Sequence, residues 1–454
     1  MRHRVHAASL ERWIDPGDAY RAICGDSDAA FWLDSGPHAT TGMSYLGLAS
    51  SVTTQFDRPV LDWLRRQLAD TTIDFSEAPD GFQLGWVGWL GYELRGQTMG
   101  VPIEHVSRYP DAAWMFIDRC LAFDHAAREV TLLALSDVEE WRNEVESALS
   151  KAPVIELPPV IESAPVIELV PVIELVEISP PTTTWAYTDA QYLDKIRACQ
   201  TAIRDGDAYQ LCLTTEASVD VTPDPVATYL ALRASSPTHH GALLRAAGVS
   251  LLSASPEQFL SVSRHGLVTT KPIKGTRPRG TTAAADVELR DELEHSDKER
   301  AENLMIVDLM RNDIGRISKV GSVSVTSLLA VESYAQVHQL VSTVRGELAD
   351  GLTAVDAIEA TFPAGSMTGA PKRSATLILD SLEQRARGIY AGAFGYLGLD
   401  GAVDLAMVIR SIIIDGEGST LGTGGGITAL SIPEEELAEA RLKAAALLRV
   451  LGAS

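Results

Sequence analysis

A proline-spaced repeat divides this chain and limits the folds that are open to it. Pro153, Pro159, Pro165 and Pro171 each begin a copy of Pro-Val-Ile-Glu, so prolines recur every six residues. This spacing breaks a helix and removes hydrogen bonds that a central strand needs. We therefore expect a repetitive linker over residues 151–183. It joins an N-terminal region, residues 1–150, to a second region, residues 184–454.

The second region alternates strand-like runs with helical segments that do not repeat a strand–helix unit. Apolar spacing predicts helices over residues 189–205, 224–235, 286–311, 335–344, 353–361 and 371–387, and from Pro433 onward. Strand-like runs cover residues 208–217, 389–398 and 403–414, with a further strand around Leu421. Residues 248–262 read as a strand pair around Ser255-Pro-Glu257. In the N-terminal region we expect helices over 60–68 and 138–149 and a hairpin within 113–135. This arrangement predicts an α+β fold, an antiparallel β-sheet sandwich flanked by helices, on which the N-terminal region packs.

The composition excludes two classes of partner. The chain has 38 Lys and Arg against 61 Asp and Glu, a formal net charge of −23, whereas binding a nucleic-acid backbone needs a basic face. No apolar run approaches the length of a bilayer-spanning segment, and the first residues lack the apolar stretch of a secretory signal. The cysteines at 24, 120, 199 and 212 form no metal or CxxC spacing. We expect a cytoplasmic protein with no nucleic acid and no membrane as partner.

One basic stretch stands out against this acidic background. Residues 271–280 read Lys-Pro-Ile-Lys-Gly-Thr-Arg-Pro-Arg-Gly and contain four cations. The prolines at 272 and 278 fix φ on either side of a Gly-Thr turn, so the segment should hold its shape. A rigid basic loop indicates a pocket for a small anion; a solvated charged turn is the alternative.

Two pairs of glutamates indicate a site for a divalent cation. Glu299 and Glu302 lie three residues apart on one predicted helix, and Glu436 and Glu439 repeat this spacing on the last helix. Two such pairs can supply the oxygen ligands that Mg²⁺ prefers, although two solvated acidic faces are the alternative. Glu257 follows Ser-Pro in apolar surroundings, where a raised pKa would suit a general acid; an exposed turn residue is the alternative.

Glycines and an arginine add candidate groups for anion binding. Residues 365–369 and 424–426 are glycine-rich loops whose backbone N–H groups can receive carboxylate oxygens, although glycines after a strand more often form turns. Arg410 ends an apolar strand, where it acts either as a bidentate carboxylate clamp or as a cation at a sheet edge.

Six motifs together resemble the chorismate-utilising enzymes, a family that includes anthranilate, isochorismate and salicylate synthases and aminodeoxychorismate synthase component I. In chain order they are Ser255-Pro-Glu257, residues 271–280, Lys298-Glu-Arg-Ala-Glu302 through Asp308-Leu-Met-Arg-Asn-Asp313, Gly365-Ser-Met-Thr-Gly-Ala-Pro-Lys372, Gly424-Gly-Gly-Ile427 and Glu436-x-x-Glu439-x-x-x-Lys443. The resemblance covers about residues 185–450. Gly85-Trp-Val-Gly-Trp-Leu-Gly-Tyr-Glu93 is similar to the N-terminal region of the amide-transferring members.

The resemblance implies a role for most of these residues. Lys274 is implied to attack the chorismate ring, and Glu257 to protonate the departing hydroxyl and return as base. Mg²⁺, held by Glu299, Glu302, Glu436 and Glu439, is implied to bind the ring carboxylate. The residues implied to bind the substrate are Gln210, Thr276, Ser366, Tyr390, Arg410, Gly425, Gly426 and Lys443. The family usually has histidine before Leu-Val-Ser; here Gln339 stands there, with His338 one step earlier, and we assign this position no role.

Two positions favour one branch of the family. Gln210 stands where isochorismate and salicylate members carry a water-activating lysine, which indicates ammonia as the incoming group. Lys274 stands where anthranilate synthases usually have alanine and aminodeoxychorismate synthases have lysine. The resemblance thus implies amination of chorismate at C4, to 4-amino-4-deoxychorismate for folate biosynthesis. No cysteine has a Gly-x-Cys-x-Gly context, so we expect ammonia from a separate glutamine amidotransferase subunit. Anthranilate synthase component I and a non-catalytic anion-binding homologue remain the alternatives.

Overall fold

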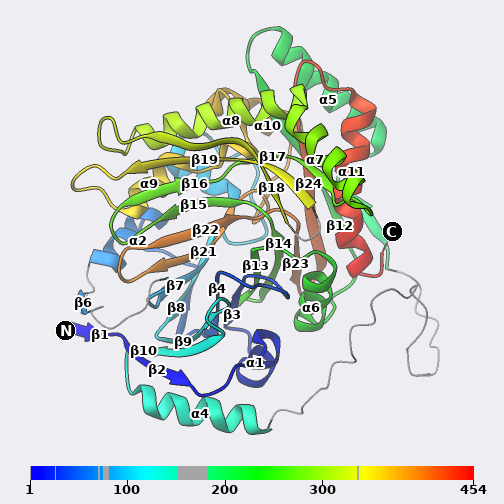
Figure 1. Ribbon diagram of the computed structural model, residues 1–454. Helices are drawn as coiled ribbons and strands as arrows, with labels where there is room; N and C mark the ends of the chain where they lie inside the picture. Colours follow the sequence, from blue (N-terminus) through cyan, green and yellow to red (C-terminus); the bar gives the residue numbers. More distant parts are fainter. Residues whose placement is uncertain are drawn as a thin grey trace, which may run out of the picture.

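Two antiparallel sheets flanked by helices form the body of the protein (Figure 1). The computed structural model describes residues 2–25, 27–69, 72–74, 81–151, 181–334 and 337–453. The predicted α+β sandwich is confirmed. Of the linker predicted over residues 151–183, residues 152–180 lie outside the described residues. Within the described ranges, no helix combines the length and the apolar character that crossing a membrane requires.

Among the described residues the larger sheet has twelve strands, and neighbouring strands in it run antiparallel. Their order is β11 (Thr183–Trp185), β12 (Gln210–Val219), β24 (Gly418–Ile427), β23 (Ser411–Asp415), β14 (Val249–Ser255), β13 (His240–Ala246), β3 (Ala30–Asp34), β4 (Met43–Leu48), β9 (Arg119–Asp124), β10 (Glu129–Ala134) and β2 (His6–Leu10). A short strand, β20 (Gly369–Ala370), also pairs with β12.

The smaller sheet, in the part of the chain that the structure describes, has ten strands and is also antiparallel. Their order is β17 (Ile273–Pro278), β19 (Val337–Glu347), β16 (Leu267–Thr270), β15 (Gln258–Val262), β22 (Val403–Met407), β21 (Ala393–Gly398), β7 (Gly85–Leu90), β8 (Ala112–Ile117) and β5 (Ser51–Thr53), with β18 (Ser324–Ser333) paired to β19. A separate parallel pair joins β1 (Arg2–Arg4) to β6 (Thr72–Asp74).

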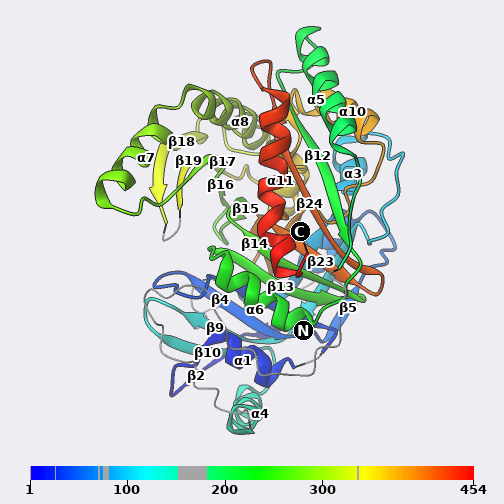
Figure 2. The ribbon, with the colours of Figure 1, turned by 90° about the vertical axis from the view of Figure 1, so that its right-hand side faces the viewer.

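Eleven α-helices surround the sheets within the described ranges. They are α1 (Pro16–Ile23), α2 (Val60–Ala69), α3 (Arg95–Met99), α4 (Val138–Lys151), α5 (Asp189–Arg204), α6 (Pro225–Ser235), α7 (Ala283–His295), α8 (Asp297–Gly315), α9 (Ala354–Thr361), α10 (Lys372–Glu383) and α11 (Pro433–Val450). α11 runs along β24, and its Leu447 shares a buried cluster with Leu421 (Figure 2). α8 packs near β19, where Ile306 and Val344 belong to one buried cluster.

Strands from the N-terminal region belong to both sheets. β3 pairs with β13, so that Trp32 lies opposite Leu243. β7 pairs with β21, so that Gly88 lies opposite Gly395. Residues before the repeat therefore contribute strands to each sheet, beside strands that follow it by many residues in sequence.

Residues 286–311, predicted as one helix, form parts of two. α7 ends at His295 and α8 begins at Asp297. Between them Ser296 has extended angles, φ −67° and ψ 108°, and its hydroxyl accepts a hydrogen bond from the Glu299 N–H at 3.5 Å. A serine that caps a helix N-terminus competes with continuation of the preceding helix. The prediction was therefore wrong at one residue, and the break places Glu299 in the first turn of α8.

The helix predicted over residues 335–344 is wrong. Its described part belongs to strand β19, which pairs with β16, β17 and β18. Every residue from His338 to Val344 is buried, so the apolar residues do not alternate with polar ones as in a half-buried strand. Periodicity alone cannot separate a short run buried on both faces from a buried helix.

Two predicted strand runs are split because the chain passes from one sheet to the other. Residues 403–414 form β22 in the smaller sheet and β23 in the larger, separated by Arg410 at φ +49°. The strand pair predicted over residues 248–262 is confirmed: β14 and β15 lie on either side of Glu257 and belong to different sheets. The first run of the predicted hairpin divides between β8 and β9. Glu257 and Arg410 thus lie at crossings between the sheets.

Two segments predicted as loops lie in strands instead. Residues 424–426 belong to β24, and residues 273–278 of the basic stretch form β17. Glycine and proline disfavour strands, but β12 and β19 supply the pairing that holds these two segments extended. Residues 365–369 form the 3₁₀ turn η2 (Gly365–Met367) and the start of β20.

Candidate active site

Glu257 is a buried carboxyl at the crossing between β14 and β15. Its residue is 7% exposed. Burial raises the pKa of Glu257 to about 7, although the nearby Ser366 hydroxyl and the Lys274 ammonium lower it. A carboxyl with this pKa can both donate and accept a proton near neutral pH, which is what a general acid that returns as a base requires.

Lys274, on β17, lies beside β24 and the acidic side chains. Its Nζ is 3.6 Å from the position that a Cβ on Gly426 would take. Burial raises the pKa of Glu302, and among the neighbouring charges Lys274 lowers it most. The partly buried Lys274 amine is therefore close enough to act on both the predicted general acid and a predicted metal ligand.

Glycines in β24 let side chains from neighbouring elements approach the strand closely. The side-chain amide nitrogen of Gln210 occupies space that a Cβ on Gly426 would need, and a Cβ on Gly425 would lie 3.0 Å from Glu436 Oε2. Gln210 is buried, and its Oε1 accepts no hydrogen bond from the described residues. Leaving a buried acceptor without a partner is costly, so this oxygen is available to a ligand.

The four predicted metal ligands project from two helices. Glu299 and Glu302 lie near the start of α8, and Glu436 and Glu439 near the start of α11. Glu302 and Glu436 are 7% and 3% exposed. Burial raises the pKa of Glu302, and the charges of Glu299 and Glu436 add to that rise. The carboxylates of both helices are thus close enough to repel one another.

This donor set fits a hard divalent cation such as Mg²⁺, which prefers carboxylate oxygens. Glu302 Oε1 is buried and accepts no hydrogen bond from the described residues, so it can serve as a ligand. The oxygens of the four glutamates are more widely spaced than in a closed metal site. Within the described ranges, the three residues whose ligand atoms lie within 4.8 Å of one another are instead Glu104, His105 and Asp380. In that set Asp380 pairs with Arg95 at 2.5 Å.

Ser366 and Lys443, two of the predicted substrate-binding residues, lie beside these groups. Ser366 Oγ is buried and makes no hydrogen bond with the described residues, yet it is close enough to lower the Glu257 pKa. Lys443 pairs with Glu439 at 2.7 Å and donates to the Gly424 carbonyl oxygen at 3.0 Å. The structure thus brings both residues to the region of Lys274.

Tyr390, Thr276 and Arg410 are placed less directly. Tyr390 is buried with its ring against Gly422 of β24, and burial raises its pKa. Thr276 lies opposite Gln339 in the ladder between β17 and β19. Arg410 is an exposed residue, but the protein around it removes enough water from its guanidinium to lower the pKa. Arg410 forms no ion pair with a carboxylate of the described residues. An arginine in this state can bind a carboxylate ligand.

Comparison with known proteins decides the family. A family model described as chorismate binding enzyme matches residues 28–449. The chain belongs to the chorismate-binding enzymes.

Two similar curated relatives of this chorismate-binding enzyme come from Streptomyces. The chain is 38% identical over 486 residues to an aminodeoxychorismate synthase of Streptomyces pristinaespiralis and 41% identical over 478 residues to one of Streptomyces griseus. Each match covers 99% of this chain, but the chain spans only 65% and 64% of the relatives' lengths. A solved anthranilate synthase component I from Streptococcus pneumoniae TIGR4 has a TM-score of 0.72 and 28% identity, over 98% of this chain and 92% of that chain.

His338 of this chorismate-binding enzyme is held by α7 and β18. Its Nε2 lies 3.0 Å from Asp286, and its Nδ1 lies 2.8 Å from the Ser333 hydroxyl. Neighbouring residues of a strand point to opposite faces, so Gln339 projects to the other side of β19. The one-residue shift noted in the sequence therefore corresponds to two different surroundings, and His338 already has two polar partners.

Two residues that were not predicted as part of the site contact a predicted metal ligand of this enzyme. Glu436 Oε1 accepts hydrogen bonds from the Ser431 hydroxyl at 2.7 Å and from Lys298 Nζ at 3.2 Å. Burial lowers the pKa of Lys298, but Glu436 and the other carboxylates outweigh this and raise it. The position of Lys298 directly before Glu299 was a signal for its role, whereas nothing in the sequence pointed to Ser431.

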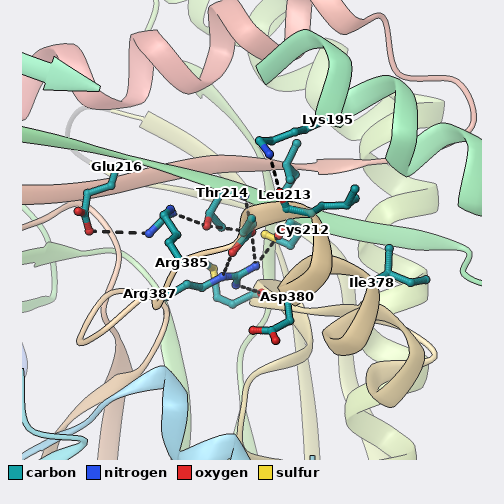
Figure 3. Close-up of polar contacts among 12 residues, drawn as sticks. Lys195, Cys212, Leu213, Thr214, Glu216, Ile378, Asp380, Arg385 and Arg387 are labelled. Carbon is teal, nitrogen blue, oxygen red and sulfur yellow. Dashed lines mark hydrogen bonds and ion pairs between the residues drawn. The ribbon is translucent and has the colours of Figure 1, made fainter. Parts of the chain in front are cut away.

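A buried polar network supports β12 beside the glycine strand (Figure 3). Arg387 pairs with Glu383 at 2.7 Å, and the two side chains are 1% and 3% exposed. Glu383 accepts a hydrogen bond from the Thr214 N–H at 2.8 Å, and Arg387 donates to the Cys212 carbonyl oxygen at 2.9 Å. Cys212 and Thr214 lie opposite the glycines of β24, so the network positions the strand that carries Gln210.

Proposed function

We propose that this chain is the chorismate-aminating component of an aminodeoxychorismate synthase. The observation that carries the proposal is the position of Lys274, whose ammonium lies beside Gly426 and acts on both Glu257 and Glu302. The Streptomyces relatives with this printed name are 38% and 41% identical to the chain. The proposed substrates are chorismate and ammonia.

In the proposed reaction, Lys274 is the nucleophile. After the Lys274 ammonium has released a proton to solvent, its amine forms a bond to C2 of chorismate while the C4 hydroxyl leaves as water with a proton from Glu257. Ammonia then forms a bond to C4, and the bond between C2 and Lys274 breaks. Glu257, deprotonated by the first step, takes a proton from the incoming ammonia. The net change is replacement of the C4 hydroxyl by an amine with release of water, and the enolpyruvyl group stays on the ring.

The remaining groups bind and orient the substrate in this proposal. Mg²⁺, held by Glu299, Glu302, Glu436 and Glu439, would bind the ring carboxylate and neutralise its charge. The cations Lys443 and Arg410 and the backbone N–H of Gly426 would receive carboxylate oxygens; Gly425, Thr276, Ser366 and Tyr390 complete the proposed substrate site. The neutral amide of Gln210 cannot take a proton from water, which favours ammonia as the incoming nucleophile.

The test is product identity. Incubation of the purified chain with chorismate, Mg²⁺ and ammonium should give 4-amino-4-deoxychorismate by chromatography and mass spectrometry, without release of pyruvate. Fluorescent anthranilate together with pyruvate would overturn the proposal in favour of anthranilate synthase component I, the activity printed for the Streptococcus pneumoniae structure. Binding of chorismate without turnover would support a non-catalytic anion-binding homologue instead.

We infer that the ammonia is supplied by a separate glutamine amidotransferase subunit. All four cysteines are buried free thiols, and burial raises the pKa of each, which makes them poor nucleophiles for releasing ammonia from glutamine. Free thiols also suit a reducing cytoplasm, the compartment we propose. Glutamine should support product formation only after a glutamine amidotransferase is added, whereas ammonium should support it alone.

A further inference from the structure

Three of the four glutamates at the proposed metal site already form ion pairs. The pairs are Arg277 with Glu299 at 3.7 Å, Lys298 with Glu436 at 3.2 Å, and Lys443 with Glu439 at 2.7 Å. Each glutamate is thus held by a cation of the protein itself, except Glu302, whose Oε1 accepts no hydrogen bond from the described residues. A divalent ion that binds here has to share these carboxylates with the cations or take them over.

The three cations differ in how firmly they are held. Arg277 also bonds to Glu292 and to the Thr276 carbonyl oxygen, and Lys443 also bonds to the Gly424 carbonyl oxygen. Lys298 has Glu436 as its one hydrogen-bond acceptor among the described residues. Its side chain is 47% exposed, whereas that of Glu436 is 4% exposed. Lys298 is therefore the cation that can leave at least cost.

The place of Lys298 in its helix also calls for an explanation. It is the second residue of α8, close to the positive end of the helix dipole, where a cation is unfavourable. Its ammonium gains instead from Glu436 on α11, so the pair connects the two helices that carry the glutamates. The ion pair offsets the unfavourable position of the Lys298 charge only while Glu436 is free to accept its hydrogen bond.

We propose that Lys298 and Mg²⁺ compete for Glu436. The inference rests on the proposed magnesium site. In the metal-free enzyme the Lys298 ammonium neutralises Glu436 and holds α8 to α11. Carboxylate ligands approach Mg²⁺ to about 2.0–2.1 Å, and a second cation on the same buried carboxylate is repelled. Binding of Mg²⁺ therefore releases the Lys298 side chain to solvent, so that Mg²⁺ replaces the Lys298 ammonium as the cation on Glu436.

The competition is measurable without any turnover. Calorimetric titration with MgCl₂ and thermal denaturation in EDTA or in saturating Mg²⁺ are compared for the wild type, Lys298→Met and Lys298→Arg. Because Lys298→Met removes the competitor, it should bind Mg²⁺ about threefold to tenfold more tightly than the wild type. Its Tm should be lower than that of the wild type in EDTA, and the difference should close in Mg²⁺. Lys298→Arg keeps the charge and should behave as the wild type.

Lys319→Met is the matched control. Lys319 is 50% exposed and pairs with Glu347 and Asp350 at 3.9 and 3.6 Å, so its removal deletes an ion-paired lysine of similar exposure that does not contact the four glutamates. It should leave Mg²⁺ affinity unchanged. Equal or weaker Mg²⁺ binding by Lys298→Met would overturn the competition while leaving the metal site intact. No Mg²⁺ binding by the wild type, with the same result for Glu302→Gln, would overturn the metal site itself. If Lys298→Met does not fold, Lys298→Gln gives the same comparison.

Discussion

The side-chain amide of Gln210 fills the space that a Cβ on Gly426 would occupy. The two residues lie on neighbouring strands, β12 and β24, and Lys274 Nζ approaches the same point to 3.6 Å. A glycine here therefore permits an amide and an amine to converge on one position, which a larger residue would prevent. The identity of residue 426 is thus tied to the residues at 210 and 274.

Gly426→Ala should weaken chorismate binding about tenfold or more, because the added methyl group displaces Gln210 and alters the geometry of the site. Calorimetric titration with chorismate measures the effect. Gly416→Ala is the control, since a Cβ there meets no atom within 4 Å. Equal affinity of the two variants would show that Gln210 and Gly426 do not shape the binding site.

Lys274→Ala should lower kcat/KM for chorismate, measured as formation of 4-amino-4-deoxychorismate, by about a hundredfold or more, because the proposed nucleophile is removed. Ammonia can then attack C2 directly, so anthranilate should appear as a minor product. Lys271→Ala is the matched control from the same basic stretch; its charge acts on His240 and Asp404 instead. Wild-type turnover by Lys274→Ala would rule out covalent catalysis by this residue.

Glu257 should make the stability of the protein fall as pH rises. Its carboxyl has a pKa of about 7 in the folded protein, against 4.5 as the ordinary value, because burial disfavours the charged form. Between these values the folded protein keeps a proton that the unfolded chain releases, which costs up to about 3 kcal/mol above pH 7 and nothing below both pKa values.

Glu257→Gln cannot ionise and should escape this loss. Relative to the wild type, its free energy of unfolding in urea should therefore be higher at pH 8 than at pH 5 by about 2–3 kcal/mol. Glu146→Gln, at an exposed position, should show no such difference. If the difference in free energy of unfolding between Glu257→Gln and the wild type did not change with pH, the Glu257 carboxyl would titrate in the ordinary range.

Glu302→Gln should abolish stabilisation by magnesium. Mg²⁺ that binds the folded protein raises Tm by mass action, and the loss of a buried ligand oxygen removes this effect. Thermal denaturation with and without MgCl₂ gives the comparison. Glu347→Gln, at a side chain 62% exposed, should keep the full shift. If Glu302→Gln also kept it, the ion would have to bind elsewhere.

Glu383→Ala should lower the free energy of unfolding by about 3–5 kcal/mol, because it leaves the Arg387 charge buried without its partner. The exposed pair of Arg142 and Glu139 at 2.9 Å provides the control. Glu139→Ala should cost no more than about 1 kcal/mol. Urea denaturation measures both, and losses of similar size would show that burial does not decide the value of the Arg387 pair.

Local signals in the sequence predicted several helices, whereas the helix predicted over residues 335–344 was wrong. α5 has the predicted apolar spacing, with Tyr192, Ile196 and Cys199 buried, and α11 begins at Pro433. Such signals are local, so they can be read without knowledge of the rest of the fold. The break between α7 and α8 at Ser296 was not predicted, because this capping serine lies inside a continuous helical pattern.

Long-range pairing was the part that the sequence did not reveal. Residues 403–414 form a largely apolar run, yet the chain turns at Arg410 and its two halves lie in different sheets. Sheet membership depends on partners far along the chain, which no local pattern encodes. For the site, spacing alone indicated Glu299, Glu302, Glu436 and Glu439, but the ion pair between Lys298 and Glu436 depends on how α8 and α11 face each other.

The shared sheets constrain how the protein can be synthesised. While a ribosome releases the first 150 residues, β3 and β7 emerge before their partners β13 and β21 have been translated. Open strand edges of this kind associate readily with other chains. The smaller sheet stays incomplete until β22 (Val403–Met407) has left the exit tunnel. Nascent chains that stall before this point should therefore depend on chaperones, however well their helices form.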